Sequence, residues 1–180
     1  ATLVEREKQA RELFLVIGPP GTGKTSHGLV AILEEQLLES DTNILLMAYT
    51  NRAVDEICRQ LIDRGIPFLR IGSEATCDPA SASHLLASQL RHLDKLSQLG
   101  DVIGGARVVC ATTATLNASL PLFSLKHFHL AIVDEASQIL EPHLIALLSA
   151  ARDGQCAIDR FVRIGDHKQL PAVVQQGTKE

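Results

Sequence analysis

The sequence predicts a three-layer α/β fold, in which a mainly parallel sheet lies between two layers of helices. Apolar runs of strand length, such as Leu13–Ile17 and Ile44–Tyr49, alternate with stretches whose apolar residues recur at helical spacing. The first strand runs directly into a glycine-rich loop at residues 18–25. Because strands and helices alternate, we expect parallel pairing with right-handed crossovers.

The remaining elements follow in chain order. A first helix leaves the glycine-rich loop and ends near Ser40 and Asp41, with apolar side chains on one side and glutamates on the other. A second helix is expected over 51–64, where Gly65 ends it. Further strands are expected at 67–71, 107–111, 129–133 and 161–164, and a further helix at 142–151.

Residues 72–105 interrupt the alternation and predict a short helical insertion. A polar turn is followed by leucines on one side of a single expected helix, at positions 86, 90, 93, 96 and 99. We interpret this apolar stripe as core packing. The alternative is a partner-binding face, which in a fragment would be a partly exposed arm. The whole chain, residues 1–180, is then expected to form one domain.

Composition excludes several classes of protein. A hydrophobic content of 46% with 21% charged residues is typical of a globular domain with a sizeable core. No apolar stretch is long enough to cross a membrane and no secretory leader precedes the first strand, so we expect an intracellular protein without a membrane partner. The four cysteines stand far apart, which indicates neither a zinc site nor a redox motif.

Charge and the chain ends add two expectations. A net charge of −4 gives no overall attraction for nucleic acid, which argues against a stand-alone nucleic-acid binder. The chain begins without a methionine and stops shortly after a motif. We therefore expect a fragment of a longer protein.

The glycine-rich loop predicts a bound nucleoside triphosphate. Its turn lets backbone N–H groups point at phosphates, and the following helix adds the positive end of its dipole. Lys24 can reach the β- and γ-phosphates, and the Thr25 hydroxyl can bind Mg²⁺. The expected nucleotide-binding residues are Gly18, Pro19, Pro20, Gly21, Thr22, Gly23, Lys24, Thr25 and Ser26.

Two acids end the apolar run at 130–133. At the carboxyl edge of a parallel sheet, beside a phosphate loop, one carboxylate is needed near Mg²⁺ and another is needed to orient water. We assign Asp134 to the metal and Glu135 to the attacking water. Gln169, after the last strand, is the candidate for sensing the γ-phosphate.

Two other strand ends are rich in hydroxyl groups. Thr50 and Asn51 follow one strand, and Thr112 and Thr113 follow another. Such residues cap helices, and they are also short polar groups that suit a phosphodiester backbone. Both interpretations stay open at this point.

The order of the motifs resembles superfamily 1 helicases. The segments GPPGTGKT, AYTNRAVD, VVCATTATL, VDEASQ and GDHKQLPAVV, spread over residues 18–174, are similar to their motifs I, Ia, Ib/Ic, II and III. The branch that includes the nonsense-mediated-decay RNA helicase and the replication nuclease–helicases is the most similar. The resemblance implies a P-loop NTPase domain of RecA-like fold that uses ATP and Mg²⁺ to move 5′→3′ along single-stranded DNA or RNA.

The resemblance also implies residue roles. Lys24 and Glu135 would be catalytic, Asp134 and Thr25 would serve Mg²⁺, and Gln169 would couple the γ-phosphate to strand movement. The candidate nucleic-acid contacts are Thr50, Asn51, Thr112 and Thr113. Ser137 and Gln138 complete motif II.

Departures from the family pattern limit what this chain can do alone. Gln9 lies closer to the phosphate loop than the adenine-reading glutamine normally does. Motifs IV to VI are absent, and with them the second RecA-like domain that supplies arginine fingers and half of the strand groove. The isolated chain is expected to turn nucleotide over slowly or not at all. The alternative is a nucleotide-dependent switch or interaction module without unwinding activity.

Two histidines, His127 and His129, alternate along an extended segment and so share one face. Such a pair could ligate a metal. The sequence offers no third ligand nearby, so we expect a structural role.

Overall fold

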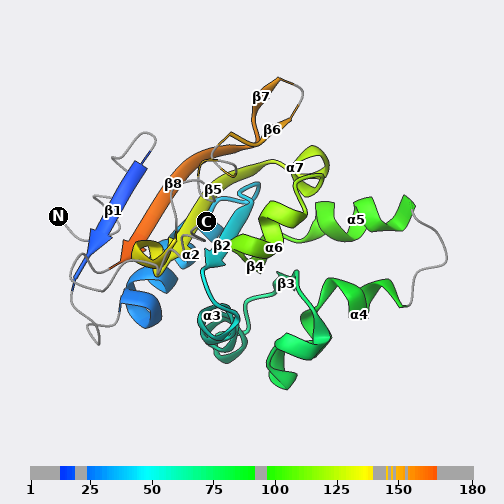
Figure 1. Cartoon of the computed structure of the whole chain (residues 1–180), viewed down its shortest axis with the longest axis horizontal. Coiled ribbons are helices and arrows are strands. Elements are labelled where there is room, and N and C mark those ends of the chain that lie inside the picture. Colours follow the sequence, from blue (N-terminus) through cyan, green and yellow to red (C-terminus); the bar gives the residue numbers. More distant parts are fainter. Residues whose placement is uncertain are drawn as a thin grey trace, which may run out of the picture.

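The computed structural model describes residues 13–18, 24–91, 97–139, 145, 147, 149–152 and 154–165. Six parallel strands form one sheet in the order β1-β8-β5-β2-β4-β3 (Figure 1). Their bounds are β1 Leu13–Ile17, β2 Ile44–Ala48, β3 Leu69–Arg70, β4 Val108–Thr112, β5 Phe128–Asp134 and β8 Ile158–Gly165. The expected α/β fold with a parallel sheet is confirmed.

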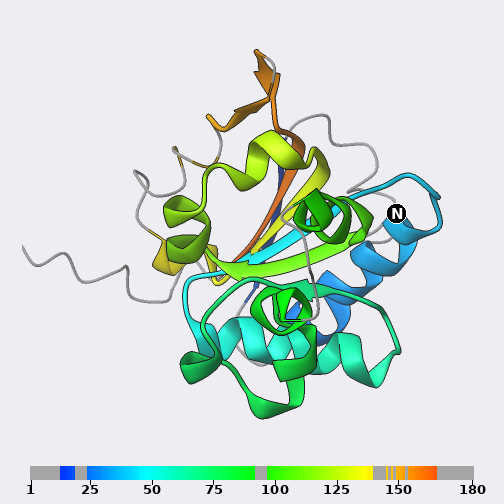
Figure 2. The ribbon, with the colours of Figure 1, turned by 90° about the vertical axis from the view of Figure 1, so that its right-hand side faces the viewer.

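Helices cover both faces of the sheet, as the side view shows (Figure 2). A π-helical segment, Lys24–Leu29, leads into α2 (Val30–Leu37), which packs with α3 (Asn51–Asp63) on one face. On the other face lie α5 (Ser97–Gly105), α6 (Thr113–Ala118) and α7 (Leu122–Leu125). The two faces thus give two cores, which share the central strands.

Burial of the strands follows their place in the sheet. Every residue of β2 and β4 is buried, as a parallel strand covered on both faces requires. The edge strand β1 instead alternates, and Leu13, Leu15 and Ile17 are about half exposed. The sequence pattern of β1 gave no sign of this difference, because its apolar run is also continuous.

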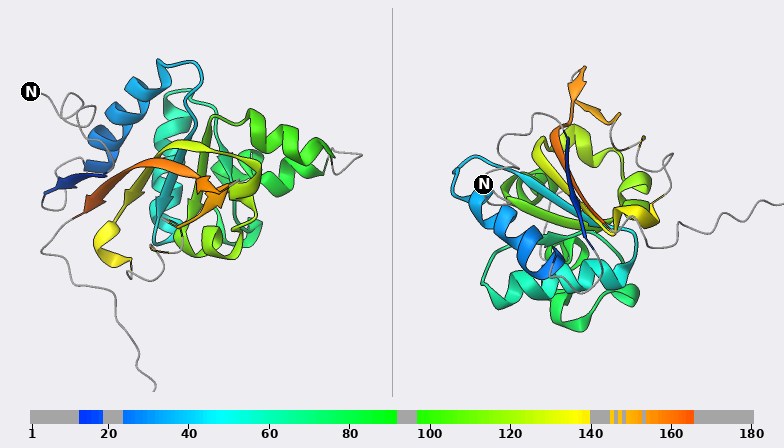
Figure 3. Two further views of the ribbon diagram at one scale, coloured as in Figure 1. Left: turned by 90° about the horizontal axis from the view of Figure 1, so that it is seen from above. Right: turned by 90° about the vertical axis from the view of Figure 1, so that its left-hand side faces the viewer.

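The insertion at 72–105 is helical, but its single expected helix is wrong. Two 3₁₀ turns, Glu74–Thr76 and Pro79–His84, precede α4 (Leu86–Leu90), which ends with Arg91 as its C-cap residue. Leu93 and Leu96 of the expected stripe lie outside the described residues, and Ser97–Gly105 forms a separate helix, α5. These helices extend past the β3 edge of the sheet (Figures 1 and 3). Leu86 and Leu99 pack against the core, so the core-packing interpretation of the leucines is confirmed at both ends of the stripe.

The region after β5 contains elements that the sequence did not predict. A 3₁₀ turn, Ala136–Gln138, follows β5, and a two-stranded hairpin, β6 (Ala151–Arg152) and β7 (Gln155–Cys156), stands away from the sheet (Figure 3). The expected helix at 142–151 lies mostly outside the described residues, and its last residue belongs to β6. Among the described helices, none combines the length and apolar character needed to span a membrane.

Candidate functional site

The carboxyl ends of the strands bring the predicted motifs to one edge of the sheet. Ala48 at the end of β2 is in register with Thr112 of β4 on one side and with Asp134 of β5 on the other. Gly18, directly after β1, donates its backbone N–H to the carbonyl oxygen of Gly165, at 3.3 Å. The ends of five strands therefore meet at the edge where open α/β sheets bind ligands.

The phosphate loop is described only at its two ends. Gly18 follows β1, and the backbones of Lys24, Thr25 and Ser26 begin the π-helical segment. Pro19, Pro20, Gly21, Thr22 and Gly23 lie outside the described residues, as does Gln169. The described parts agree with a strand that leads through the loop into a helix, and the roles of these residues stay predictions.

The two acids of motif II lie at the end of β5. Asp134 is 4% exposed, and its Oδ1 accepts the backbone N–H of Glu135 at 2.9 Å. Glu135 has φ 50° and ψ 36°, and it is the one non-glycine residue with positive φ in the described chain. This left-handed conformation costs about 1–2 kcal/mol for a residue with a Cβ atom. Such strain is concentrated at functional sites.

The surroundings of Glu135 favour its neutral form. Burial raises the pKa of Glu135, and the neighbouring negative charge of Asp134 raises it further. The cation of Arg52 and a hydrogen bond from the Thr50 side chain act in the opposite direction. The net pKa lies above its usual value, so this carboxylate is a stronger base than an exposed glutamate.

One atom of Glu135 has no partner. Its Oε2 is buried and accepts no hydrogen bond from the described residues. A buried carboxylate oxygen normally has a partner, so this atom indicates a place for a water or a cation. Together with the buried carboxylate of Asp134, it is a donor set that fits Mg²⁺ and a positioned water.

A cavity of about 280 Å³ connects the two acids to the start of α3. Its lining residues are Thr50, Arg52, Ala53, Glu56, Arg59, Asp134 and Glu135. The candidate base Glu135 and Thr50, one of the predicted nucleic-acid contacts, therefore border the same cavity. A movement of the α3 N-terminus would change the surroundings of Glu135 directly.

The start of α3 is fixed by its own side chains. The Thr50 hydroxyl accepts the backbone N–H of Ala53 at 3.1 Å, which confirms its helix-capping role. Asn51 Oδ1 accepts a hydrogen bond from Arg70 Nη2 at 3.3 Å. The same guanidinium nitrogen lies 2.9 Å from Asp55 Oδ1, in an ion pair without hydrogen-bond geometry.

Arg70 is a residue that the sequence reasoning missed. It is 1% exposed, at the end of the short strand β3, and its side chain reaches three positions on α3, at Asn51, Asp55 and Cys58. The available signal was an arginine inside the otherwise apolar strand at 67–71. A buried guanidinium needs partners, so it predicts acceptors on a neighbouring element.

Thr112 and Thr113 are both buried. Thr112 Oγ1 accepts the backbone N–H of Thr115 at 3.1 Å and lies 2.8 Å from the Thr115 hydroxyl. Thr112 therefore caps α6, one of the two roles that the sequence left open. A contact to nucleic acid stays a prediction for Thr50, Asn51, Thr112 and Thr113.

The end of β8 passes close to the turn after β5. A Cβ atom at Gly165 would lie 3.4 Å from the backbone nitrogen of Ser137, which is van der Waals contact with the turn after β5. Ser137 Oγ is buried without a hydrogen-bond partner in the described chain. The side chain of Gln138 lies outside the described residues.

Comparison with known proteins gives a consistent picture. The family described as AAA domain matches residues 2–101 and 95–176. DNA replication ATP-dependent helicase/nuclease JHS1 of Arabidopsis thaliana is 37% identical over 167 residues, which are 92% of this chain and 12% of the relative. The human DNA replication ATP-dependent helicase/nuclease DNA2 is 34% identical over 167 residues, which are 92% of this chain and 15% of the relative.

A solved structure shows the same fold. The UvsW helicase of bacteriophage T4 superposes with a TM-score of 0.62 at 16% identity, over 91% of this chain and 50% of that one. The chain spans only a small part of the length of its curated relatives. The family match covers nearly all of the chain, so the chain belongs to the family described as AAA domain.

Proposed function

We propose that this chain is the ATP-binding and ATP-hydrolysing motor domain of a superfamily 1 DNA helicase, which couples hydrolysis to movement along single-stranded DNA. The observation that carries the proposal is the cavity between Asp134, Glu135 and the start of α3. In this cavity the two carboxylates assigned to hydrolysis lie beside Thr50, a predicted contact to single-stranded nucleic acid.

Nucleotide would bind at the loop of residues 18–26. The backbone amides there and Lys24 hold the phosphates, while Thr25 and Asp134 hold Mg²⁺. When bound, the metal would neutralise the negative charge that develops on the phosphate oxygens. The buried side chain of Asp134 at the carboxyl end of β5, separated only by β8 from the strand that leads into the loop, supports this assignment.

Glu135 acts as the general base. Its carboxylate accepts a proton from the water that attacks the γ-phosphate, and its raised pKa strengthens it for this role. The left-handed backbone of Glu135 directs the chain into the turn at 136–138. The unpartnered Oε2 marks where the water is held.

Movement along the strand follows from the shared cavity. Thr50 and Arg52 influence the charge of Glu135, and they belong to the first turn and cap of α3. Gln169 would report the γ-phosphate. Short polar side chains would hold the single-stranded DNA at its phosphate groups. Such contacts need few lysines and arginines, which suits a chain with a net charge of −4.

A second RecA-like domain in the same polypeptide completes the site in this proposal. It would supply arginine fingers, which are worth about 10³–10⁵ in rate. DNA is the proposed substrate because the curated relatives are DNA replication helicase/nucleases. The protein would then act inside the cell, where that DNA is.

The test is steady-state ATP hydrolysis by the proposed longer protein, which contains this chain and a second RecA-like domain. The rate is measured with single-stranded DNA, with RNA of the same sequence, and with neither. We expect stimulation by DNA, and no hydrolysis under any condition in Lys24→Ala. Stimulation by RNA alone would replace DNA with RNA as the substrate. Stimulation by neither polymer would favour the nucleotide-dependent switch instead.

A further inference from the structure

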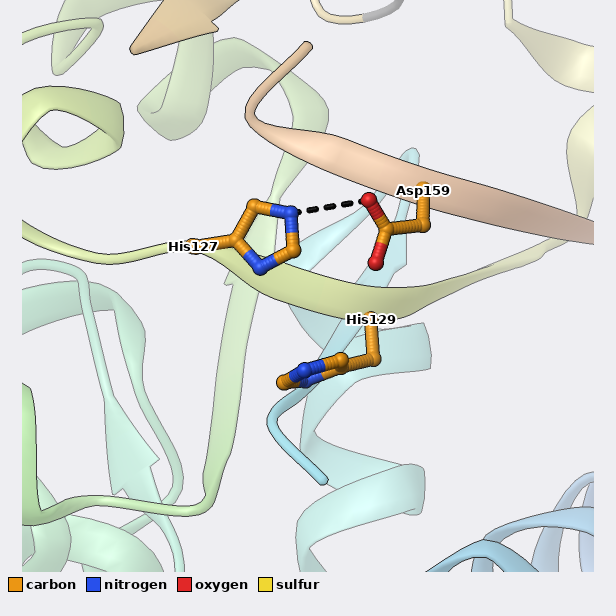
Figure 4. Close-up of side chains that lie close together, drawn as sticks. All are labelled: His127, His129 and Asp159. Atoms are coloured by element: carbon orange, nitrogen blue, oxygen red, sulfur yellow. Dashed lines mark hydrogen bonds and ion pairs between the residues drawn. The ribbon is translucent and has the colours of Figure 1, made fainter. Parts of the chain in front are cut away.

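Three potential metal ligands meet at the amino edge of the sheet, away from the nucleotide site. They are His127, His129 and Asp159, and one ligand atom from each lies within 4.8 Å of the others (Figure 4). The sequence showed the two histidines without a third ligand. The fold corrects that expectation, because it supplies Asp159 from the neighbouring strand.

The parallel register explains the cluster. Phe128 pairs with Ile158 and Leu130 pairs with Arg160, so His129 lies level with Asp159. His127 lies two residues before His129 and therefore on the same side of the extended chain. His129 and Asp159 lie in the paired strands β5 and β8, and His127 directly precedes β5.

The three side chains already interact. His127 Nε2 lies 2.8 Å from Asp159 Oδ1, and the two imidazole rings are 5.1 Å apart with an interplanar angle of 85°. The side chains of His127 and Asp159 are 32% and 49% exposed. An ion can therefore reach the cluster from solvent.

We propose that His127, His129 and Asp159 form a binding site for a divalent transition-metal ion, for which Zn²⁺ is the probe. Two imidazoles and one carboxylate are ligands that Zn²⁺, Cu²⁺ and Ni²⁺ prefer, whereas Mg²⁺ and Ca²⁺ prefer oxygen ligands alone. Water would fill the remaining coordination position. Such a site has three protein ligands and stays open to solvent.

Binding requires rearrangement at all three ligands. The hydrogen bond between His127 and Asp159 must give way to metal bonds, with release of any proton between them. His129 Nδ1 now accepts the backbone N–H of Asn43 at 3.0 Å. A neutral imidazole that accepts at Nδ1 carries its proton on Nε2, so His129 must turn its ring or give up this hydrogen bond. The site is therefore weaker than a preformed centre with four ligands.

A bound ion would join the first residues of β5 to those of β8. The site uses none of the residues assigned to nucleotide or strand binding, so it is independent of the proposed function. We expect metal to stabilise this edge of the sheet without being consumed in any reaction.

The first test is a Zn²⁺ titration of the metal-free chain in competition with a chromogenic chelator. We expect one ion per chain, and a Zn²⁺ affinity at least about ten-fold weaker in His129→Ala and in Asp159→Asn. Even the loss of a residue that only hydrogen-bonds to a metal ligand weakens metal binding by about this factor. His84→Ala is the matched control, because it removes an imidazole that stacks on Phe68 outside the cluster. Its Zn²⁺ affinity should equal that of the parent.

Absorption of the Co²⁺ complex identifies the ligands. The proposal expects weak d–d bands without a sulfur-to-metal charge-transfer band, and loss of these bands in the double variant His127→Ala/His129→Ala. A charge-transfer band would assign the ion to a thiolate, such as the exposed Cys156, and would overturn the proposal. Equal Zn²⁺ affinity in the parent and the double variant, or no binding by the folded parent, would also overturn it.

Discussion

The two edges of the sheet differ in how completely their polar groups are satisfied. At the carboxyl edge, Glu135 has a left-handed backbone, and both Glu135 Oε2 and Ser137 Oγ are buried without partners among the described residues. At the amino edge, Arg107 donates to the carbonyl oxygens of Leu37 and Thr42, at 3.2 and 3.3 Å. Lys126 Nζ donates to the carbonyl oxygen of Gly104 at 2.8 Å.

We interpret Arg107 and Lys126 at the amino edge as stabilising the fold, and the unpaired groups at the carboxyl edge as part of the proposed nucleotide site. Arg107 and Lys126 donate to the last carbonyl groups of α2 and α5, where a helix leaves acceptors unpaired and where a cation is favoured. At the carboxyl edge, strain and unpaired groups remain, although both lower stability. In our proposal, bound nucleotide, Mg²⁺ and water supply the missing partners.

The largest expected effect is on hydrolysis. Glu135→Gln removes the base and keeps the shape of the side chain, so the ATP hydrolysis rate of the longer protein should fall about 10²–10⁴-fold. Nucleotide binding, measured with a fluorescent ATP analogue, should persist. Glu39→Gln, an exposed glutamate after α2, is the control and should keep the parent rate. If Glu135→Gln hydrolysed ATP at the parent rate, Glu135 would not be the general base.

The next effect is on the network beneath the carboxyl edge. Arg70→Met leaves Asp55 as a buried carboxylate without its cation, which should lower the free energy of unfolding by about 3–5 kcal/mol. Urea unfolding followed by circular dichroism measures it. Arg59→Met breaks the exposed pair with Asp78 and should lower the free energy of unfolding far less, because solvent screens an exposed ion pair. Equal losses in the two variants would show that Arg70 does not hold α3.

The backbone strain at Glu135 can be tested by two substitutions that both remove the carboxylate. Glu135→Gly should be more stable than Glu135→Ala by about 1–2 kcal/mol, because glycine adopts φ 50° without a Cβ clash. The midpoints of chemical unfolding give the difference. If alanine proves as stable as glycine, the left-handed conformation is not a cost at this position.

A smaller effect is expected at a helix cap. Thr112→Ala removes the oxygen that accepts the Thr115 N–H and should cost about 1 kcal/mol in unfolding free energy. Thr112→Ser keeps that oxygen and should recover most of the loss. A loss of single-stranded DNA affinity in Thr112→Ser would point to a further role for the methyl group.

The smallest effect is the pH dependence of stability. The pKa of Glu135 is raised on folding, so the folded chain binds more protons than the unfolded chain between its usual value of 4.5 and the raised value. The stability contributed by Glu135 is therefore present below pH 4.5 and is lost as pH rises through that window. Glu135→Gln should lack this loss in melting curves measured across the window. A parallel pH dependence in both proteins would mean that the Glu135 pKa is not raised.

Much of the fold could be predicted because its signals are local. The strands β2 and β4 are continuous apolar runs, and Thr50 caps α3 from the position where a capping residue belongs. The break between α4 and α5 could not be read, because the leucine spacing continues across it.

The candidate site was predictable in residue identity but not in conformation. Asp134 and Glu135 follow an apolar strand, and this position alone places them at the ligand edge. The positive φ of Glu135 and the partners of Arg70 depend on contacts between distant segments. The same is true of Asp159, which reaches His127 only through the register of β5 and β8.

The most direct test of the account is the affinity of Glu135→Gln, in the longer protein, for single-stranded DNA with ATP and Mg²⁺, with ADP, and without nucleotide. Fluorescence anisotropy of labelled DNA measures it without interference from hydrolysis. Because the acids and the start of α3 border one cavity, nucleotide should change the DNA affinity by about 5–150-fold. The same DNA affinity in all three conditions would contradict coupling between the two parts of the carboxyl edge.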